Sequence, residues 1–364
     1  MQHKTKFMQI AALVSGGVDS SVTIPLLKEQ GFDPVIFYIK IGMEDDPSFV
    51  DCPSEEDIEI TSYIAKKYGC KMEIVDLQRA YWETVVAYTI ETVKKGLTPN
   101  PDVMCNRLIK FGAFETSFGH QFNKISTGHY ARILEKENGV YLGTAVDPIK
   151  DQTYFLGRIT YPQLSKLMFP LGELQKPEVR RIAEKMRLPS AHRPDSQGIC
   201  FLGKINYNDF IRRYAGEKEG AIVELESGRK LGKHQGFWFH TIGQRKGLGL
   251  SGGPWFVVKK DVEENIIYVS NGYDPVSQYR EQIYLDDMQL LHASFMLKDD
   301  MKIRFKIRHQ PEFNTGKLKQ EGQRWYILSD VPISGIAPGQ FGVLYHAEED
   351  YCLGSGIIAE KQTS

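Results

Sequence analysis

The sequence predicts an α/β fold: a helix-covered parallel sheet, followed by a small central domain and a C-terminal β-barrel. Over roughly the first 165 residues, short apolar runs alternate with helical patterns, as in a helix-covered parallel sheet. Long helical patterns stop near residue 205, and glycine and aromatic residues then become frequent. From residue 275 onward, short alternating runs separated by turns indicate a small barrel.

The length and composition are those of an ordinary globular protein with two or three domains. The chain has 364 residues, of which 41% are hydrophobic and 25% are charged, and its net charge is −1. The mean hydropathy is −0.34, and no apolar run reaches the roughly 18 residues of a membrane span. We therefore expect no membrane partner. We expect the domains to span residues 1–205, 206–274 and 275–364.

The predicted elements of the first domain follow in order from the apolar patterns. Buried strands are expected at residues 8–14, 34–41, 72–77 and 125–127, and helices at residues 20–30, 54–69, 81–95, 102–118 and 161–186. The second helix begins with Ser54 and three acidic residues, a start typical of a capped helix. Pro99 and Pro101 make a rigid break before the fourth helix.

A glycine-rich turn between the first strand and the first helix is the strongest local signal. Residues 15–21 read Ser-Gly-Gly-Val-Asp-Ser-Ser. Glycine lets the backbone approach a bulky anion, and the helix N-terminus favours phosphate. The lysine of a Walker A loop is absent; instead the turn looks like the pyrophosphate-gripping loop of adenylate-forming ATP pyrophosphatases. A bare glycine turn without a ligand is the alternative.

A nucleotide is expected at the carboxyl ends of these strands, with Ile39 packing against the adenine or its ribose. The expected ATP-binding residues are Leu13, Val14, Ser15, Gly16, Gly17, Val18, Asp19, Ser20, Ile39 and Gly128.

The five cysteines are too few and too scattered for a disulfide framework, and none forms a CxxC pair. A reducing cytoplasm is therefore the expected compartment, and no metal centre is expected. Cys52 has acidic neighbours, which oppose thiolate formation, so we expect it to be inert. Cys70 and Cys352 are interpreted as structural.

Two cysteines are candidates for chemistry. Asp102 and Cys105 lie three residues apart on a predicted helix and share a face. A helix N-terminus and nearby basic residues favour the thiolate of Cys105, and Asp102 is placed to move a proton. A small buried thiol is the alternative for Cys105. Cys200 follows a loop sequence of Pro, Asp, Ser and Gly, where reactive groups are commonly held. A structural thiol is the alternative for Cys200 as well.

Three basic or glycine-rich segments are candidate binding surfaces. Residues 176–193 carry six basic and two acidic residues. In residues 302–308, four cations alternate with three apolar side chains, so that the cations share one strand face. Such a face, which includes Lys306, suits a phosphate backbone or is simply solvated. The run at 243–253 is a cationic loop that clamps RNA or a partner, or only links strands.

Together these residues resemble the tRNA-specific 2-thiouridylases, the family that thiolates the wobble uridine. Seven stretches match in the family's order: residues 15–21, 100–106, 127–130, 150–156, 195–201, 240–249 and 337–340. The resemblance implies ATP-dependent 2-thiolation through an adenylated uridine. It implies that Cys200 carries a persulfide sulfur and that Cys105 is the partner nucleophile, acting by disulfide formation or by release of sulfide.

The resemblance also implies the partners: the anticodon arm of tRNA and a persulfide donor such as a cysteine desulfurase or relay protein. We expect Mg²⁺ with ATP, without a dedicated metal cage. The implied tRNA contacts are Asn100, Pro101, Asp102, His129, Lys150, Asp151, Gln152, Arg308, His309 and Gln340.

Two other functions are compatible with the phosphate loop. One is an ATP-dependent amidotransferase-type ligase, although no glutaminase half is recognisable and such ligases do not need paired cysteines. The other is a non-catalytic, nucleotide-dependent RNA-binding protein. ATP consumption that depends on tRNA favours the thiouridylase, whereas consumption that depends on ammonia favours the ligase. The absence of AMP and pyrophosphate products favours the RNA-binding protein.

Overall fold

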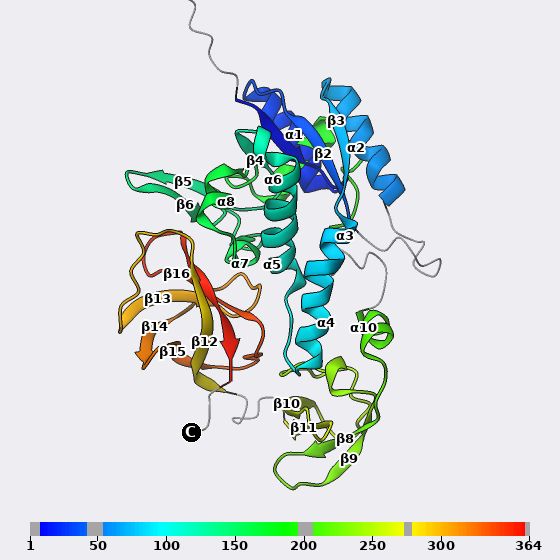
Figure 1. Ribbon diagram of the computed structural model, residues 1–364, viewed down its shortest axis with the longest axis vertical. Coiled ribbons are helices and arrows are strands. Elements are labelled where there is room, and N and C mark those ends of the chain that lie inside the picture. The colour runs from blue at the N-terminus through cyan, green and yellow to red at the C-terminus, as the bar shows by residue number, and fades with distance from the viewer. Residues whose placement is uncertain (1–7, 42–53, 196–206, 273–278, 361–364) are drawn as a thin grey trace, which may run out of the picture.

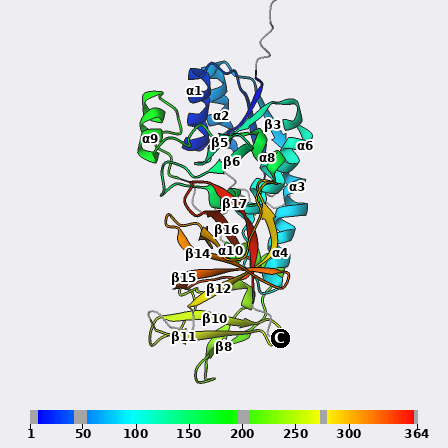
Figure 2. The same ribbon diagram turned by 90° about the vertical axis from the view of Figure 1, so that its left-hand side faces the viewer.

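A computed structural model describes residues 8–41, 54–195, 207–272 and 279–360. The two views show the N-terminal α/β domain at the top, the closed barrel below it and the central domain at the bottom (Figures 1 and 2). The predicted fold class is therefore confirmed. Within the described residues, no helix is both long enough and apolar enough to cross a bilayer.

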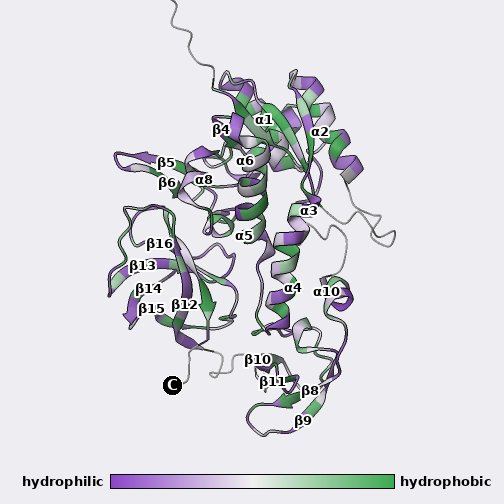
Figure 3. Cartoon of the chain, viewed as in Figure 1, coloured by the Kyte–Doolittle hydropathy of each residue, from purple (hydrophilic) through white to green (hydrophobic). Residues whose placement is uncertain are grey.

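The N-terminal domain is built on a five-stranded sheet in the order β3-β2-β1-β4-β7, with all neighbours parallel. Its strands are β1 (Ile10–Leu13), β2 (Val35–Lys40), β3 (Met72–Asp76), β4 (Lys124–Ser126) and β7 (Leu167–Met168). Every residue of β1 is buried, as its apolar sequence predicts, and Figure 3 shows apolar residues along the strands beneath α1. Parallel pairing brings the carboxyl ends of β1, β2 and β4 to one rim.

Helices connect and cover these strands. They are α1 (Val18–Glu29), α2 (Ser54–Tyr68), α3 (Gln78–Tyr81), α4 (Ala87–Lys94), α5 (Pro101–Cys105), α6 (Phe114–Ser117), α7 (Thr153–Leu156), α8 (Tyr161–Lys166) and α9 (Lys176–Lys185). π-Helical stretches at Trp82–Val86 and Asn106–Ala113 join α3 to α4 and α5 to α6. The predicted helices at 81–95 and 102–118 are therefore each one continuous helical rod.

The prediction of helix across residues 161–186 is wrong in its middle. Strand β7 and a turn separate α8 from α9, because Pro170 and Gly172 interrupt the helical pattern. A hairpin of β5 (Arg132–Lys136) and β6 (Gly139–Gly143), which was not predicted, follows β4. Its turn residues are Glu137 and Asn138, and Gly139, with φ of 127°, pairs with Lys136 as the first residue of β6.

The central domain contains α10 (Tyr207–Ala215) and a sheet in the order β10-β11-β8-β9. The strands are β8 (Gly220–Glu224), β9 (Lys230–His234), β10 (Trp255–Asp261) and β11 (Ile266–Asn271). Its small core contains Ile222, Trp255, Val257 and Val269.

The C-terminal barrel closes in the order β12-β15-β14-β13-β16-β17. The strands are β12 (Arg280–Leu290), β13 (Met301–Lys306), β14 (Asn314–Glu321), β15 (Arg324–Ile333), β16 (Phe341–His346) and β17 (Cys352–Ala359). Cys352 is fully buried, which fits its structural interpretation.

The prediction that four cations of residues 302–308 form one solvent-facing strand surface is wrong. The apolar positions 303, 305 and 307 are buried as expected, but Lys306 is buried as well. Its Nζ lies 3.0 Å from Oδ2 of Asp151 in the N-terminal domain, and the two side chains are 0% and 2% exposed. Alternation along a strand identifies its two faces but does not show what packs against each face. Lys306 lies in the interface between the barrel and the N-terminal domain.

The central domain should lose stability in acid because it buries neutral histidines. Burial lowers the pKa of His240 from 6.5 to about 4 and also lowers the pKa of His234. Between these pH values the unfolded chain binds more protons, so stability falls as the pH falls. From the shift for His240 we expect a loss of about 3 kcal/mol. Urea unfolding from about pH 7 to about pH 4, compared with a His240→Gln variant, measures it; an identical pH dependence in both proteins would contradict it.

Candidate active site

The phosphate loop lies where the sequence predicts it, between β1 and α1. Gly17 is the N-cap of α1 and provides no side-chain acceptor for the N–H groups of the first helical turn. Oγ of Ser20 accepts a 3.1 Å hydrogen bond from the N–H of Ser15 and so closes the turn. Gly16 has φ of 75°, and a Cβ there would lie 2.7 Å from Cα of Asp57. The loop therefore requires glycine and presents backbone donors at a helix N-terminus, a geometry suited to phosphate.

Basic side chains from α9 and the segment after it hold this loop. Nζ of Lys176 lies 2.6 and 2.8 Å from the carboxylate oxygens of Asp19 and 2.8 Å from Oδ1 of Asp195. Arg193 donates to the carbonyl of Gly16 at 3.1 Å. Two side chains of the basic stretch 176–193, Lys176 and Arg193, therefore contact the phosphate loop and do not simply extend into solvent.

Asp195 is the centre of this ionic cluster. Lys150 and Arg180 contact its carboxylate at 2.7 and 2.6 Å, in addition to Lys176. Burial raises the pKa of this carboxyl, but the hydrogen bonds and charges of Lys150 and Lys176 outweigh burial and leave the pKa well below its ordinary value. Asp195 is thus a fixed negative charge that gathers cations beside the loop.

The segment after β4 connects the loop to the helix of Cys105. A Cβ on Gly128 would lie 2.6 Å from the backbone N of Ser20, so this glycine allows close approach to α1. His129 places Nδ1 2.8 Å from Oγ1 of Thr127, and its ring lies 6.1 Å from that of Phe111. Burial, together with the charge of Lys110, lowers the pKa of His129 well below its usual value. We conclude that His129 is a neutral imidazole at this rim.

The helix that carries Asp102 and Cys105 begins as predicted. Oδ1 of Asn100 accepts from the N–H of Val103 at 3.2 Å, and Pro101 occupies the first helical position. Asp102 is half-buried, whereas Cys105 is 1% exposed. Cys105 is thus as buried as a structural thiol, but it lies near a helix N-terminus, as a reactive thiolate would.

Residues 150–155 join the helix to the barrel. The side chain of Asp151 is 2% exposed and accepts from the N–H of Ala145 as well as from Lys306. The ring of His309 lies 4.7 Å from that of Phe155, whose carbonyl accepts from Nδ2 of Asn106 at 3.1 Å.

The remaining implied tRNA contacts differ in accessibility. Oε1 of Gln152 is bonded to the N–H of Tyr130, whereas Arg308 is exposed. Ile39, at the end of β2, is half-buried.

Cys200 and Cys52 lie outside the described residues. The predicted meeting of Cys105 and Cys200 therefore stays a prediction, as do the roles of both thiols. In sequence, Cys200 follows Asp195 by five residues.

The acidic residues beside the phosphate loop fit a magnesium ion that a bound nucleotide would bring. Asp19 and Asp195 provide two carboxylates next to the phosphate loop, and Mg²⁺ is commonly held by one or two carboxylates together with phosphate oxygens. Across the described ranges, no group of three or more His, Cys, Asp or Glu side chains forms a metal cluster.

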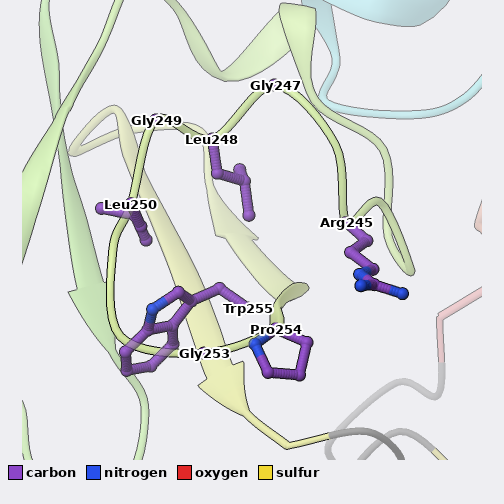
Figure 4. A pocket seen from close by; sticks show the side chains of 8 residues that line it. All are labelled: Arg245, Gly247, Leu248, Gly249, Leu250, Gly253, Pro254 and Trp255. Atoms are coloured by element: carbon purple, nitrogen blue, oxygen red, sulfur yellow. The ribbon is translucent and has the colours of Figure 1, made fainter.

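A hollow lies in the central domain, far from the phosphate loop. The glycine-rich loop borders an open pocket of about 430 Å³, lined by Arg245, Leu248, Leu250 and Trp255 among others (Figure 4). Figure 1 places this domain at the opposite end of the molecule from α1. The pocket therefore lies apart from the phosphate loop.

The fold and the site define a HUP-domain protein with two appended β-domains. Models of a tRNA methyl transferase HUP domain, a tRNA methyl transferase PRC-barrel domain and an aminomethyltransferase β-barrel domain match residues 8–204, 208–271 and 280–358. The tRNA-specific 2-thiouridylase MnmA of Parabacteroides distasonis is 61% identical over 97% of this chain and 99% of its own length. That of Porphyromonas gingivalis is 58% identical, with 97% and 99% covered. The chain belongs to the tRNA-specific 2-thiouridylase family.

Sequence reasoning missed the cations that organise the site. Lys176 and Arg193 were visible only as members of a basic stretch, because their acidic partners Asp19 and Asp57 lie more than a hundred residues away. The partner of Arg180 is Asp195, 15 residues further along the chain. Their positive charge was the available signal, but the direction in which each side chain points depends on tertiary packing.

Proposed function

We propose that this protein is a tRNA-uridine 2-sulfurtransferase that thiolates the wobble uridine with ATP. The observation that carries the proposal is the contact path from the phosphate loop, through Gly128 and His129, to the helix of Asp102 and Cys105. Family membership supports tRNA as the substrate. The few scattered cysteines favour a cytoplasmic location.

Adenylation is the first step of the proposed reaction. A uridine carbonyl oxygen is a poor leaving group, so its attack on the α-phosphate of ATP converts it into an AMP ester and releases pyrophosphate. The loop at residues 15–20 grips that pyrophosphate through its backbone N–H groups and hydroxyls. Lys176 is positioned beside the same loop to offset the added negative charge.

Sulfur transfer follows, with a persulfide on Cys200 supplied by a separate donor protein. Its terminal sulfur attacks C2, AMP departs with the original oxygen, and Cys105 attacks the Cys200 sulfur to release the thiocarbonyl. In the second route Cys105 attacks the persulfide first, and the released sulfide attacks C2. Both routes leave a Cys105–Cys200 disulfide that an external thiol reduces. Asp102 is placed to accept a proton during these steps.

Nucleoside mass spectrometry tests this function. The protein is incubated with unmodified tRNA, ATP, Mg²⁺ and a persulfide donor, and the tRNA is then digested. We expect exchange of one oxygen for sulfur in the wobble uridine, only when ATP is present. Incorporation of ammonia would instead indicate the amidotransferase-type ligase, and tRNA binding without AMP formation would indicate a non-catalytic protein.

Lys176 should be important for ATP affinity. Replacing Lys176 by Met leaves the carboxylate of Asp19 without its cation beside the incoming phosphates and removes one of the three cations on Asp195. Loss of a charged hydrogen bond of this kind corresponds to about a ten- to hundredfold weaker affinity. Equilibrium binding of a non-hydrolysable ATP analogue measures it, with Arg181→Met as the control because Arg181 is exposed on the same helix. Equal affinities in the two variants would contradict the assignment.

A further inference from the structure

The guanidinium of Arg193 joins the phosphate loop to the first turn of α2. Its Nη1 donates to the carbonyl of Gly16 at 3.1 Å and lies 2.5 Å from Oδ1 of Asp57. Its Nη2 lies 3.3 Å from Oε2 of Glu56. The side chains of Arg193 and Asp57 are 24% and 18% exposed, so most of this contact is buried. One side chain from the segment after α9 therefore holds the loop and the helix together.

The peptide that Arg193 holds joins two glycines. Gly16 has φ of 75° and Gly17 has φ of −74°. Glycine adopts positive and negative φ about equally well, so a peptide between two glycines turns over at little steric cost. The sequence of the loop alone therefore does not fix the direction in which the carbonyl of Gly16 points.

The direction of this carbonyl sets the direction of the next N–H group. The peptide is trans, so the N–H of Gly17 points away from the carbonyl of Gly16. Because that carbonyl faces Arg193, the N–H faces away from Arg193. Among the described residues, no hydrogen bond uses the N–H of Gly17. It is thus a free donor at the residue that caps α1, next to the unpaired N–H groups of the first helical turn.

The same contacts turn two groups that repel anions away from this donor. The carbonyl oxygen of Gly16 carries a partial negative charge and the carboxylate of Asp57 a full one, and both are bound by the guanidinium. In the opposite orientation, the peptide would present the Gly16 oxygen where it now presents the Gly17 N–H. A phosphate would then meet an acceptor in place of a donor.

We propose that Arg193 is a positioning residue for the phosphate loop, which holds the Gly16–Gly17 peptide with its N–H directed at the pyrophosphate group of ATP. Arg193 acts through the backbone and does not itself bind the phosphates. The inference rests on the proposed function in taking ATP as the ligand. Arg193 precedes Cys200 by seven residues in the sequence, so the chain that leads to the predicted sulfur carrier also shapes the nucleotide site.

Backbone NMR tests the orientation without any ligand. The sequence contains two Gly-Gly pairs, 16–17 and 252–253. Protein with ¹³C at the glycine carbonyls and ¹⁵N at the glycine nitrogens therefore gives two peaks in an HNCO spectrum. In Arg193→Met the 16–17 peak should move, because the carbonyl of Gly16 loses its charged donor. The 252–253 peak should stay, which shows that the central domain is folded. A 16–17 peak at the wild-type position in the variant would overturn the proposal.

Ligand affinities separate a positioning role from a general loss of structure. Inorganic pyrophosphate binds through the loop, whereas adenosine has no phosphate. By titration calorimetry, Arg193→Met should bind pyrophosphate about tenfold more weakly than wild type, with the affinity for adenosine unchanged. Arg181→Met is the control for removing one positive charge, because Arg181 is exposed on α9. Equal weakening for both ligands, or an unchanged affinity for pyrophosphate, would overturn the proposal.

Asp57→Leu separates positioning from direct attraction between Arg193 and phosphate. Leucine has the branched shape of aspartate without its charge, so this variant keeps the Arg193 cation and removes a negative charge beside the loop. We expect pyrophosphate to bind severalfold more weakly, because the guanidinium loses the partner that holds it against Gly16. Unchanged or stronger binding would assign Arg193 to direct attraction and overturn the proposal.

These measurements distinguish failure of this inference from failure of the proposed function. A wild type that binds neither adenosine nor pyrophosphate refutes both the nucleotide site and the positioning role of Arg193. Binding of both ligands without thiolation of tRNA refutes only the proposed reaction, because the orientation of the Gly16–Gly17 peptide is measured without tRNA.

Discussion

Replacing Cys200 by Ser should abolish thiolation and leave tRNA-dependent AMP formation intact. A serine oxygen cannot carry the persulfide sulfur, whereas adenylation depends on the phosphate loop and on Lys176. We expect thiolation to fall by at least about a thousandfold, as for loss of a catalytic nucleophile. AMP and thiolated uridine are measured in the same reaction, the first by chromatography and the second by mass spectrometry of nucleosides.

The control for this experiment is Cys70→Ser. Cys70 is half-buried after α2, and burial raises the pKa of its thiol, which makes it a poor nucleophile. This variant should retain both activities. Thiolation that persists in Cys200→Ser at the level of Cys70→Ser would refute the assigned role of Cys200.

Replacing Lys306 by Met should strongly destabilise the protein. Lys306 and Asp151 form an ion pair whose side chains are 0% and 2% exposed, and methionine would leave the Asp151 carboxylate buried without its cation. Removing one partner of such a pair costs about 3–5 kcal/mol. Urea unfolding measures the change, with Lys302→Met as the control because Lys302 is exposed on the same strand.

A double variant tests the physical cause. Adding Asp151→Asn to Lys306→Met removes the uncompensated charge, so the double variant should be more stable than Lys306→Met alone. If Lys306→Met unfolds at the same urea concentration as Lys302→Met, the buried pair does not stabilise the domain interface.

The parts of this structure that depend on local sequence were predicted well. The apolar run at β1, the glycine turn after it and the proline-led start of α5 are each determined by neighbouring residues. Strand β7 was not predicted, because two residues carry almost no periodic signal and their pairing with β4 decides their conformation.

The directions of side chains at the domain interfaces were predicted less well than the helices and strands. The period-two pattern of β13 located its two faces, but the domain that covers Lys306 comes from residues about 150 positions earlier. The structure also bonds the amide of Gln340 to residues 98–100 across another domain interface, a contact that the sequence did not indicate. Such contacts follow from domain docking, which no local pattern encodes.

The stoichiometry of AMP to thiolated uridine tests the central claim most directly. Both products are quantified in one reaction of wild-type protein with unmodified tRNA, ATP, Mg²⁺ and a persulfide donor. The account predicts one AMP for each sulfur incorporated, with neither product formed when tRNA is omitted. Thiolation without AMP, or with ADP as the nucleotide product, would contradict activation of the uridine by adenylation.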